Sequence, residues 1–379
     1  MKKLGIYVHI PFCMRKCYYC DFYSVKWDKQ SEDNYVNAVI REIEGYKQLG
    51  SEYIADTIYF GGGTPTVINP SNIRKIIQAI KDIFTVDAAA EISIEANPNT
   101  LTSENLTTYK ASGINRLSIG VQSLNDNILK NIGRLHDSRQ ALEAIELART
   151  LGFENINADV MFNIPNQTVK DIIYTLTQLA EKKVKHISFY SLKLEKGTPM
   201  YQMEKNHTIA MLEEEEEREI YYAGREEMKK YNLLQYEISN FAETGYECKH
   251  NLKYWQQNEY IGIGTAAHSF LNKKRYSNIS DIDTYCKNAD SGNFNRTTLE
   301  VLDSAALMFE YIMLNLRLTK GLDVKEFNQR FLTDFNNYYR KEIDYLIQNN
   351  LLAYENNSVK LTEKGMDISN YVFQRFLPK

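Results

Sequence analysis

The chain has 379 residues, of which 43% are hydrophobic, and its 45 basic and 49 acidic residues give a net charge of −4. This length can bury a barrel-sized core with a small domain beside it. The slightly acidic balance gives no electrostatic reason to expect nucleic-acid binding. The sequence contains no apolar run of about 18 residues that would span a bilayer. It also shows no signal peptide, so we expect a cytoplasmic protein.

The first predicted element is a strand over residues 4–10, and it leads into a loop that holds three of the five cysteines. Cys13, Cys17 and Cys20 are separated by three and then two residues. Three thiolates satisfy three irons of a four-iron cluster and leave the fourth iron open to a non-protein ligand. Zinc is the alternative, but structural zinc usually takes two pairs of ligands, and His9 on the strand is a poor fourth ligand. A disulfide is not expected in a reducing compartment.

From residue 4 to about residue 236, apolar strand segments alternate with segments of helical periodicity. This alternation predicts an α/β fold with a parallel sheet and helices packed outside it. Roughly six or seven such units suit an open or partial (β/α) barrel. The predicted strands are 4–10, 56–60, 91–95, 116–121, 155–161 and 185–192, and the predicted helices begin near Ser31, Ser71, Thr102 and Ser138, surround Ile172 and cover the charged segment 210–231.

Barrels of this kind carry their sites at the carboxyl ends of the strands. The glycine run 61–63 follows the second strand there, and it lets the backbone approach a ligand closely, although a tight turn would also need glycine. Glu95 and Gln122 lie at the ends of later strands, and Asp159 lies in an apolar run where a bare carboxylate is costly. Taken singly, each is better explained by a structural hydrogen bond. Together at one rim, they suit a ligand with a ribose, an amine and a carboxylate.

The segment His250-Asn-Leu-Lys-Tyr254-Trp255 places a histidine beside two aromatic residues in one predicted loop. Histidine is a common axial ligand of haem, and aromatic side chains suit a flat ligand. From the residues alone, a loop anchored by aromatic packing is the better explanation. Cys248 is a candidate thiolate ligand nearby, but a buried and inert thiol is expected for both Cys248 and Cys286.

The last 80 residues carry three apolar helical stripes followed by a hairpin with Asn356-Asn357 at its turn. Three helices and a hairpin predict a winged-helix-like domain. A DNA-binding role is not expected, because the third helix carries acids and the chain is net acidic. The predicted domains are a partial barrel over 1–235, a connecting segment with the 250–255 motif over 236–300, and the C-terminal domain over 301–379.

These motifs resemble the radical SAM family, in which S-adenosylmethionine (SAM) chelates the open iron of the cluster. The segments Tyr7-Val-His-Ile-Pro-Phe-Cys13 and Cys20-Asp-Phe22-Tyr are most similar to the branch that holds the oxygen-independent coproporphyrinogen III oxidases and the haem chaperones of the HemW family. The likeness covers nearly the entire chain. It implies a radical SAM partial barrel with SAM contacts at Tyr7, Tyr19, Gly62, Gly63, Thr64, Glu95, Gln122, Arg134 and Asp159. From the residues alone, Arg134 is the weakest of these, since lone loop arginines are usually solvated.

At residues 250–255 the resemblance favours haem binding over the packing role that the residues alone suggest, because this segment is similar to an H-N-x-x-Y-W motif associated with haem. It implies haem contacts from His250, Tyr254 and Trp255. The implied function is a haem chaperone that binds haem and passes it to acceptor proteins. It would carry a SAM-coordinated four-iron, four-sulfur (4Fe–4S) cluster on Cys13, Cys17 and Cys20. No catalytic residue is assigned.

Two other functions stay open: an oxygen-independent coproporphyrinogen III oxidase, and a non-catalytic iron–sulfur or zinc protein. We expect no oxidase activity, because the oxidases carry one more cysteine two residues after the third, where this chain has Phe22. They also carry a long segment before the barrel, whereas Tyr7 is six residues from the start here. The sequence leaves open the acceptor, the axial haem ligand, cleavage of SAM, a homodimer and peripheral membrane contact.

Overall fold

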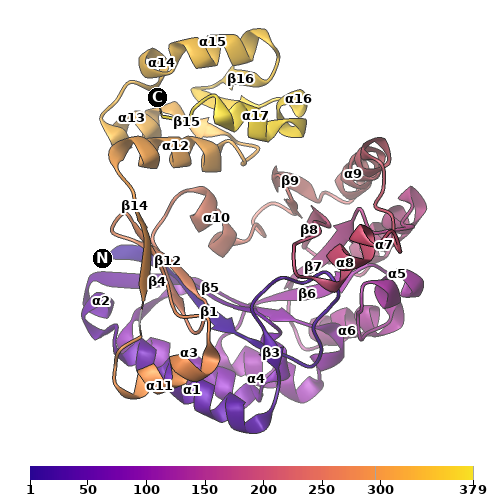
Figure 1. Cartoon of the computed structure of the whole chain (residues 1–379), viewed down its shortest axis with the longest axis vertical. Helices are drawn as coiled ribbons and strands as arrows, with labels where there is room; N and C mark the ends of the chain where they lie inside the picture. The colour runs from indigo at the N-terminus through magenta and orange to yellow at the C-terminus, as the bar shows by residue number, and fades with distance from the viewer. Residues whose placement is uncertain (295, 379) are drawn as a thin grey trace.

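A computed structural model describes residues 1–294 and 296–378 and contains a 12-stranded sheet (Figure 1). The central strands of this sheet pair in parallel, in the order β1-β4-β5-β6-β7-β8. They span β1 Lys2–Ile10, β4 Tyr53–Gly62, β5 Thr85–Ala96, β6 Arg116–Gln122, β7 Asn155–Phe162 and β8 His186–Ser191. The strands that the sequence predicted, and the partial (β/α) barrel that they imply, are therefore confirmed.

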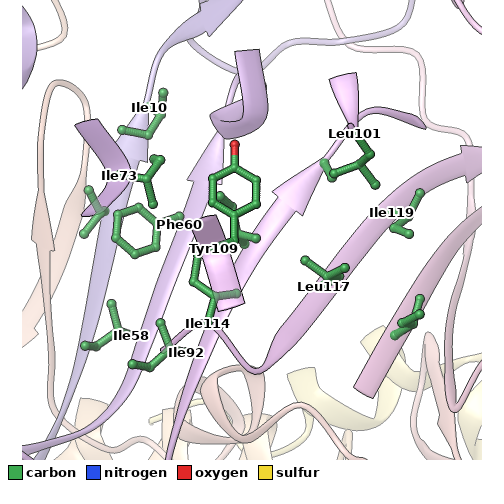
Figure 2. Packing of buried hydrophobic residues seen from close by; sticks show 14 of the residues in the cluster. Ile10, Ile58, Phe60, Ile73, Ile92, Leu101, Tyr109, Ile114, Leu117 and Ile119 are labelled. Atoms are coloured by element: carbon green, nitrogen blue, oxygen red, sulfur yellow. The ribbon is translucent and has the colours of Figure 1, made fainter. Parts of the chain in front are cut away.

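Helices connect the parallel strands and cover the outer face of the sheet (Figure 1). Figure 2 shows the layer between them, where Phe60 of β4 and Ile92 of β5 lie near Ile73 and Tyr109 from the helices. Each fully buried side chain of this size contributes about 1.5–3 kcal/mol through removal from water. The helices are α1 Lys29–Glu44, α2 Lys47–Glu52, α3 Pro70–Ile83, α4 Ser103–Ser112, α5 Asp126–Asn131, α6 Ser138–Thr150, α7 Val169–Glu181, α8 Pro199–Lys205 and α9 Glu214–Lys230, with short 3₁₀ turns η1 Pro65–Val67 and η2 Pro98–Thr100.

The helix boundaries follow their capping residues. Thr102 caps α4 by accepting the Asn105 N–H, and Gly113 ends it with a φ of 102°, as the sequence predicted. Helix α3 begins earlier than the predicted Ser71, because Asn69 is the capping residue and Pro70 occupies the first turn, where its missing N–H costs nothing.

The sheet continues past the predicted barrel boundary at residue 235, which lies within β9. On one edge, β9 Leu234–Glu237 and β10 Asn240–Ala242 add antiparallel strands beside β8. On the other edge, β11 Tyr260–Ile263 pairs in parallel with β1 and is followed by antiparallel β12 His268–Leu271, β13 Lys274–Ser277 and β14 Thr297–Val301. Helix α11 Ile282–Asp290 packs on α1.

The 250–255 motif lies on a helix, α10 Lys249–Trp255, and not in the loop that we expected. In a helix, residues four apart share a face, so His250 and Tyr254 point the same way. Helix α10 lies between the sheet and the C-terminal domain, contacting β4 on one side and α12 on the other (Figure 1).

The C-terminal domain has its own buried core and the predicted winged-helix-like set of helices and hairpin. Asn356 and Asn357 join the hairpin strands with φ of 50° and 65°, values that suit a tight two-residue turn. The elements are α12 Ser304–Asn315, β15 Leu322–Asp323, α13 Val324–Phe331, α14 Phe335–Tyr338, α15 Arg340–Gln348, β16 Leu352–Glu355, β17 Ser358–Leu361, α16 Glu363–Asp367 and α17 Ser369–Gln374. No helix in residues 1–294 or 296–378 has the length and apolar character needed to span a bilayer.

Candidate functional site

A cavity of about 460 Å³ opens at the carboxyl ends of the parallel strands. The cysteine loop forms one part of its wall, and the ends of β4 to β8 form the rest. Of the residues predicted for the cluster and for SAM, those lining the cavity are Cys13, Cys17, Tyr19, Cys20, Gly62, Gly63, Thr64, Glu95, Gln122, Arg134 and Asp159. Residues far apart in the sequence are thus brought to one rim of the sheet, as barrel topology requires.

The cysteine loop is tied to the barrel rim by hydrogen bonds. The short strands β2 Phe12–Cys13 and β3 Val25–Lys26 pair at its base, and Cys13 Sγ lies 3.6 Å from Thr64 Oγ1. Cys17 Sγ accepts a hydrogen bond from Arg134 Nη1 at 3.4 Å. Burial raises the pKa of Cys13 and raises that of Cys20 to about 11. Because iron binds thiolates, cluster binding would displace these thiol protons.

The glycine run leaves no room for side chains where β4 meets the cysteine loop. Gly62 has a φ of 113°, and a Cβ there would lie 2.5 Å from the His9 ring. A Cβ on Gly63 would lie 2.7 Å from the Phe12 carbonyl oxygen and 3.1 Å from Cys13 Sγ. Gly62 therefore lets β4 approach the His9 ring, and Gly63 lets it approach the backbone of the cysteine loop beside the Cys13 thiol.

Glu95 is a half-buried residue on the cavity wall, and its carboxyl group accepts two hydrogen bonds. Its carboxyl group accepts from the Tyr59 hydroxyl at 2.9 Å and from the Gly62 N–H at 3.1 Å. Burial, with a further contribution from Asp159, raises the pKa of Glu95 to about 7. A carboxyl group of this kind changes charge near neutral pH and favours a cationic partner.

Asp159 and Gln122 are the other polar candidates from the strands. The Asp159 carboxyl group accepts from Asn157 Nδ2 at 2.7 Å and from Ser118 Oγ at 3.4 Å, and its burial raises its pKa. Gln122 has a φ of 66°, and its side-chain oxygen accepts from the Tyr190 hydroxyl at 3.0 Å. The structural hydrogen bonds that the sequence suggested for these residues are therefore present, and both side chains still face the cavity.

Arg134 is better anchored than a solvated loop arginine. Its guanidinium donates to the Gly120 carbonyl at 2.6 Å as well as to Cys17. Its Nε is buried without a hydrogen-bond partner among the described residues, and the same holds there for the side-chain oxygen of Asn97 on the cavity wall. Unpaired buried polar atoms are costly, so these two mark positions that a polar ligand would satisfy. The three thiols, with Gly62 and Gly63 beside them and these two unpaired atoms on the wall, fit an iron–sulfur cluster with a polar ligand next to it.

Tyr7 does not line this cavity. Its hydroxyl group shares a hydrogen bond with His9 Nδ1 at 3.1 Å, and its ring stacks on Tyr59 with 6.2 Å between centroids. Tyr59 in turn holds Glu95, so Tyr7 lies behind the wall and supports it. A direct SAM contact from Tyr7 stays a prediction.

His250 is only 1% exposed, and both of its ring nitrogens are engaged. Nδ1 shares a hydrogen bond with Thr57 Oγ1 at 2.8 Å, and Nε2 shares one with the Tyr254 hydroxyl at 2.8 Å. The ring stacks on Tyr59 at 5.2 Å. In this conformation His250 fastens α10 to β4, and ligation of haem iron would first require one of these bonds to break. The haem contact of His250 stays a prediction.

Trp255 is more accessible than His250, and the two cysteines outside the cysteine loop are at least half-buried. Trp255 is half-buried, and the Arg317 guanidinium carbon lies 4.9 Å from the centroid of its ring. Cys248 is buried, as expected, and burial raises its pKa to about 12. Cys286 is half-buried, and burial raises its pKa to about 11.

The buried state of His250 predicts a pH-dependent stability. Burial lowers its pKa from the ordinary 6.5 to about 3. Between these values the unfolded chain binds a proton that the folded chain does not, so stability falls as the pH drops below 6.5. This group contributes about 2 kcal/mol to the loss between about pH 7 and about pH 5.

The measurement is chemical denaturation of the reconstituted protein under anaerobic conditions at both pH values. His250→Gln should be less stable than the wild type at pH 7, and the gap should narrow toward pH 5. The exposed His207 provides the control, since His207→Gln should leave the pH dependence of stability unchanged. A constant gap for His250→Gln would contradict a buried neutral imidazole.

Among the cavity-wall residues that the sequence interpretation missed, six lie at or near the end of β8: Ser188, Tyr190, Ser191, Leu192, Lys193 and Glu195. The strand itself was predicted. The rule that sites lie at the carboxyl ends of strands was applied to four segments and not to this one, and it would have found Ser188 and Tyr190.

Comparison with known proteins shows which family has this sequence and fold. The profile of the radical SAM superfamily matches residues 7–179, which hold the cysteine loop and strands β1 to β7, and the profile of the HemN C-terminal domain matches residues 302–368. A protein named Heme chaperone HemW from Lactococcus lactis is 34% identical, over 99% of this chain and 98% of its own length. The chain belongs to the HemW family. The relative of the same name from Bacillus subtilis is also 34% identical, over 98% of each chain.

Membership of the radical SAM superfamily implies a 4Fe–4S cluster and SAM. The solved structure of coproporphyrinogen III oxidase (HemN) from Escherichia coli is similar, with a TM-score of 0.86 over 99% of this chain and 90% of that one, at 23% sequence identity. That likeness confirms the fold, and it carries no statement about activity. Over nearly the full length, the chain shares a higher identity, 34%, with the HemW proteins of Lactococcus lactis and Bacillus subtilis.

Proposed function

We propose that this protein is a cytoplasmic haem chaperone, which binds haem and passes it to acceptor proteins. The observation that carries the proposal is the identity of 34% with Heme chaperone HemW of Lactococcus lactis across 99% of this chain. We further propose that Cys13, Cys17 and Cys20 hold a 4Fe–4S cluster whose open iron takes SAM. When bound, such a cluster supplies one-electron chemistry.

The chain's own residues support binding of SAM beside the thiols. Two half-buried carboxyl groups on the cavity wall, those of Glu95 and Asp159, suit the positive charge and the hydroxyl groups of SAM. The unpaired Arg134 Nε supplies a donor for an anionic group. Gly62 and Gly63 let the end of β4 pack closely against His9 and the cysteine loop, and both glycines line the cavity beside the thiols.

Phe22 favours the chaperone over the oxidase. Phe22 lines the same cavity, and 65% of its surface is exposed. The oxidases that this chain resembles carry a further cysteine at this position. Its ring supplies neither a thiol nor a hydrogen-bonding group to a substrate. The fold does not discriminate between the two functions, because HemN shares it.

The decisive experiment is anaerobic reconstitution of the cluster followed by titration with haem. We expect stoichiometric binding, seen as a saturable Soret band, and transfer of the haem to an apo-haemoprotein mixed with the loaded protein. The same preparation, reduced and supplied with SAM and coproporphyrinogen III, should release no protoporphyrinogen IX. Repeated turnover of coproporphyrinogen III, together with a failure to transfer haem in the titration experiment, would show that the protein is an oxidase and not a chaperone.

A further inference from the structure

A second and larger cavity, of about 990 Å³, lies between the sheet and the C-terminal domain. Its wall includes Lys2 and Lys3 at the start of β1 and Asp87 near the start of β5, so it lies at the amino ends of the strands. The cysteine cavity lies at their opposite, carboxyl ends. Helix α10 forms one side of the larger cavity, and α12 and α13 of the C-terminal domain form another. Figure 1 shows α10 between the sheet and α12.

The wall of this inter-domain cavity has a large apolar part drawn from four elements. Leu252 comes from α10, Phe270 from β12, Leu307 and Met308 from α12, and Phe331 from α13. Phe270 and Leu307 belong to one small buried cluster against which Phe331 packs. A flat apolar ligand could therefore contact both the barrel and the C-terminal domain.

The charged part of the wall is positive, although the chain as a whole has a net charge of −4. Its basic residues are Lys2, Lys3, Lys249, Lys253, Lys273 and Arg330, and its acidic residues are Asp56, Asp87 and Glu259. One pair is internal, because Lys253 Nζ lies 2.6 Å from the Asp56 carboxylate. The remaining cations still outnumber the carboxylates, and a positively charged cavity raises the local concentration of anionic ligands.

Helix α10 turns its two faces to different surroundings. His250 bonds to Thr57 of β4 and to Tyr254 and does not line the inter-domain cavity, whereas Lys249 and Leu252 line it. The buried histidine therefore holds in place the helix whose other face carries an apolar and a cationic side chain. This arrangement lets the motif serve a ligand that its histidine does not touch.

We propose that this inter-domain cavity is the haem site, with the macrocycle against the apolar wall and the two propionates toward Lys249 and Lys273. The inference rests on the proposed function for the choice of haem. A tetrapyrrole with two carboxylates matches both parts of the wall, and the volume of about 990 Å³ lies at the upper end of small-molecule sites, which run to about 1,000 Å³. Both lysines are exposed and so can reorient onto a ligand.

The test is a Soret titration of the reconstituted full-length protein with hemin and, separately, with hemin dimethyl ester. Lys249→Glu, Lys273→Glu and Leu252→Asp should each weaken hemin binding by about tenfold. The dimethyl ester, which lacks the carboxylates, should respond only to Leu252→Asp. Lys170→Glu on α7 reverses an exposed lysine outside the cavity and should change nothing.

Iron content and the thermal midpoint report whether each variant folds. Lys273→Glu should disturb α10 least, because Lys273 lies in the turn between β12 and β13. If the wild type binds hemin and all three cavity variants bind it with the same affinity, this site is wrong and the chaperone function still stands. Failure of the wild type to bind hemin would instead overturn the chaperone function and this site with it. Weakened hemin binding in the lysine variants, with the ester unaffected, would support the site.

Discussion

Replacing Cys13, Cys17 or Cys20 with alanine should abolish the 4Fe–4S cluster, and this is the largest single-residue effect that we expect. The cluster would have only three protein ligands, so loss of one leaves two thiolates for four irons. Iron and acid-labile sulfide content after anaerobic reconstitution, together with the visible absorption of the cluster, measure the loss.

The two remaining cysteines are matched controls. Cys248 is buried at the start of α10, and Cys286 lies on α11 outside the cysteine cavity. Cys248→Ala and Cys286→Ala should therefore keep the full iron content. Loss of the cluster in either control, or its retention in a loop variant, would show that the ligand set is assigned wrongly.

The carboxyl-end rule explains why so much of the cysteine cavity could be predicted from sequence. Once alternating strands and helices are recognised, parallel pairing puts every strand's carboxyl end at one rim. Glu95, Gln122 and Asp159 could then be placed together without any knowledge of their contacts. Tyr7 was assigned from the resemblance and not from this rule, and its position on the strand does not reveal that the side chain bonds to His9 and stacks on Tyr59.

The environment of the 250–255 motif could not be predicted for a different physical reason. Whether a histidine is a free ligand or a buried anchor depends on partners distant in the sequence, here Thr57 on β4. Strands β11 to β14 were also missed, because they are short and most are antiparallel, outside the strand–helix alternation that signalled the barrel. The inter-domain cavity depends on how α12 and α13 lie against α10, which no local pattern encodes.

SAM should bind the reduced cluster more weakly as the pH falls below about 7, and Glu95→Gln should remove most of this dependence. Burial, with a further contribution from Asp159, raises the pKa of Glu95 to about 7, so its carboxyl group is ionised above that pH and neutral below it. SAM carries positive charge, so the ionised form is the one that binds it. Affinity should fall by up to about tenfold per pH unit while Glu95 titrates.

The measurement is a titration of the reduced cluster with SAM at several pH values, followed by electron paramagnetic resonance. At a pH where Glu95 is ionised, Glu95→Gln should weaken binding by about 2 kcal/mol, or about thirtyfold, because a charged hydrogen-bonding partner is lost. Comparing variant and wild type at each pH cancels the titration of SAM itself. Glu104→Gln, at an exposed position on α4, should behave as the wild type. A wild-type affinity that is flat across neutral pH, or a Glu95→Gln variant with the full pH dependence, would remove Glu95 from the SAM site.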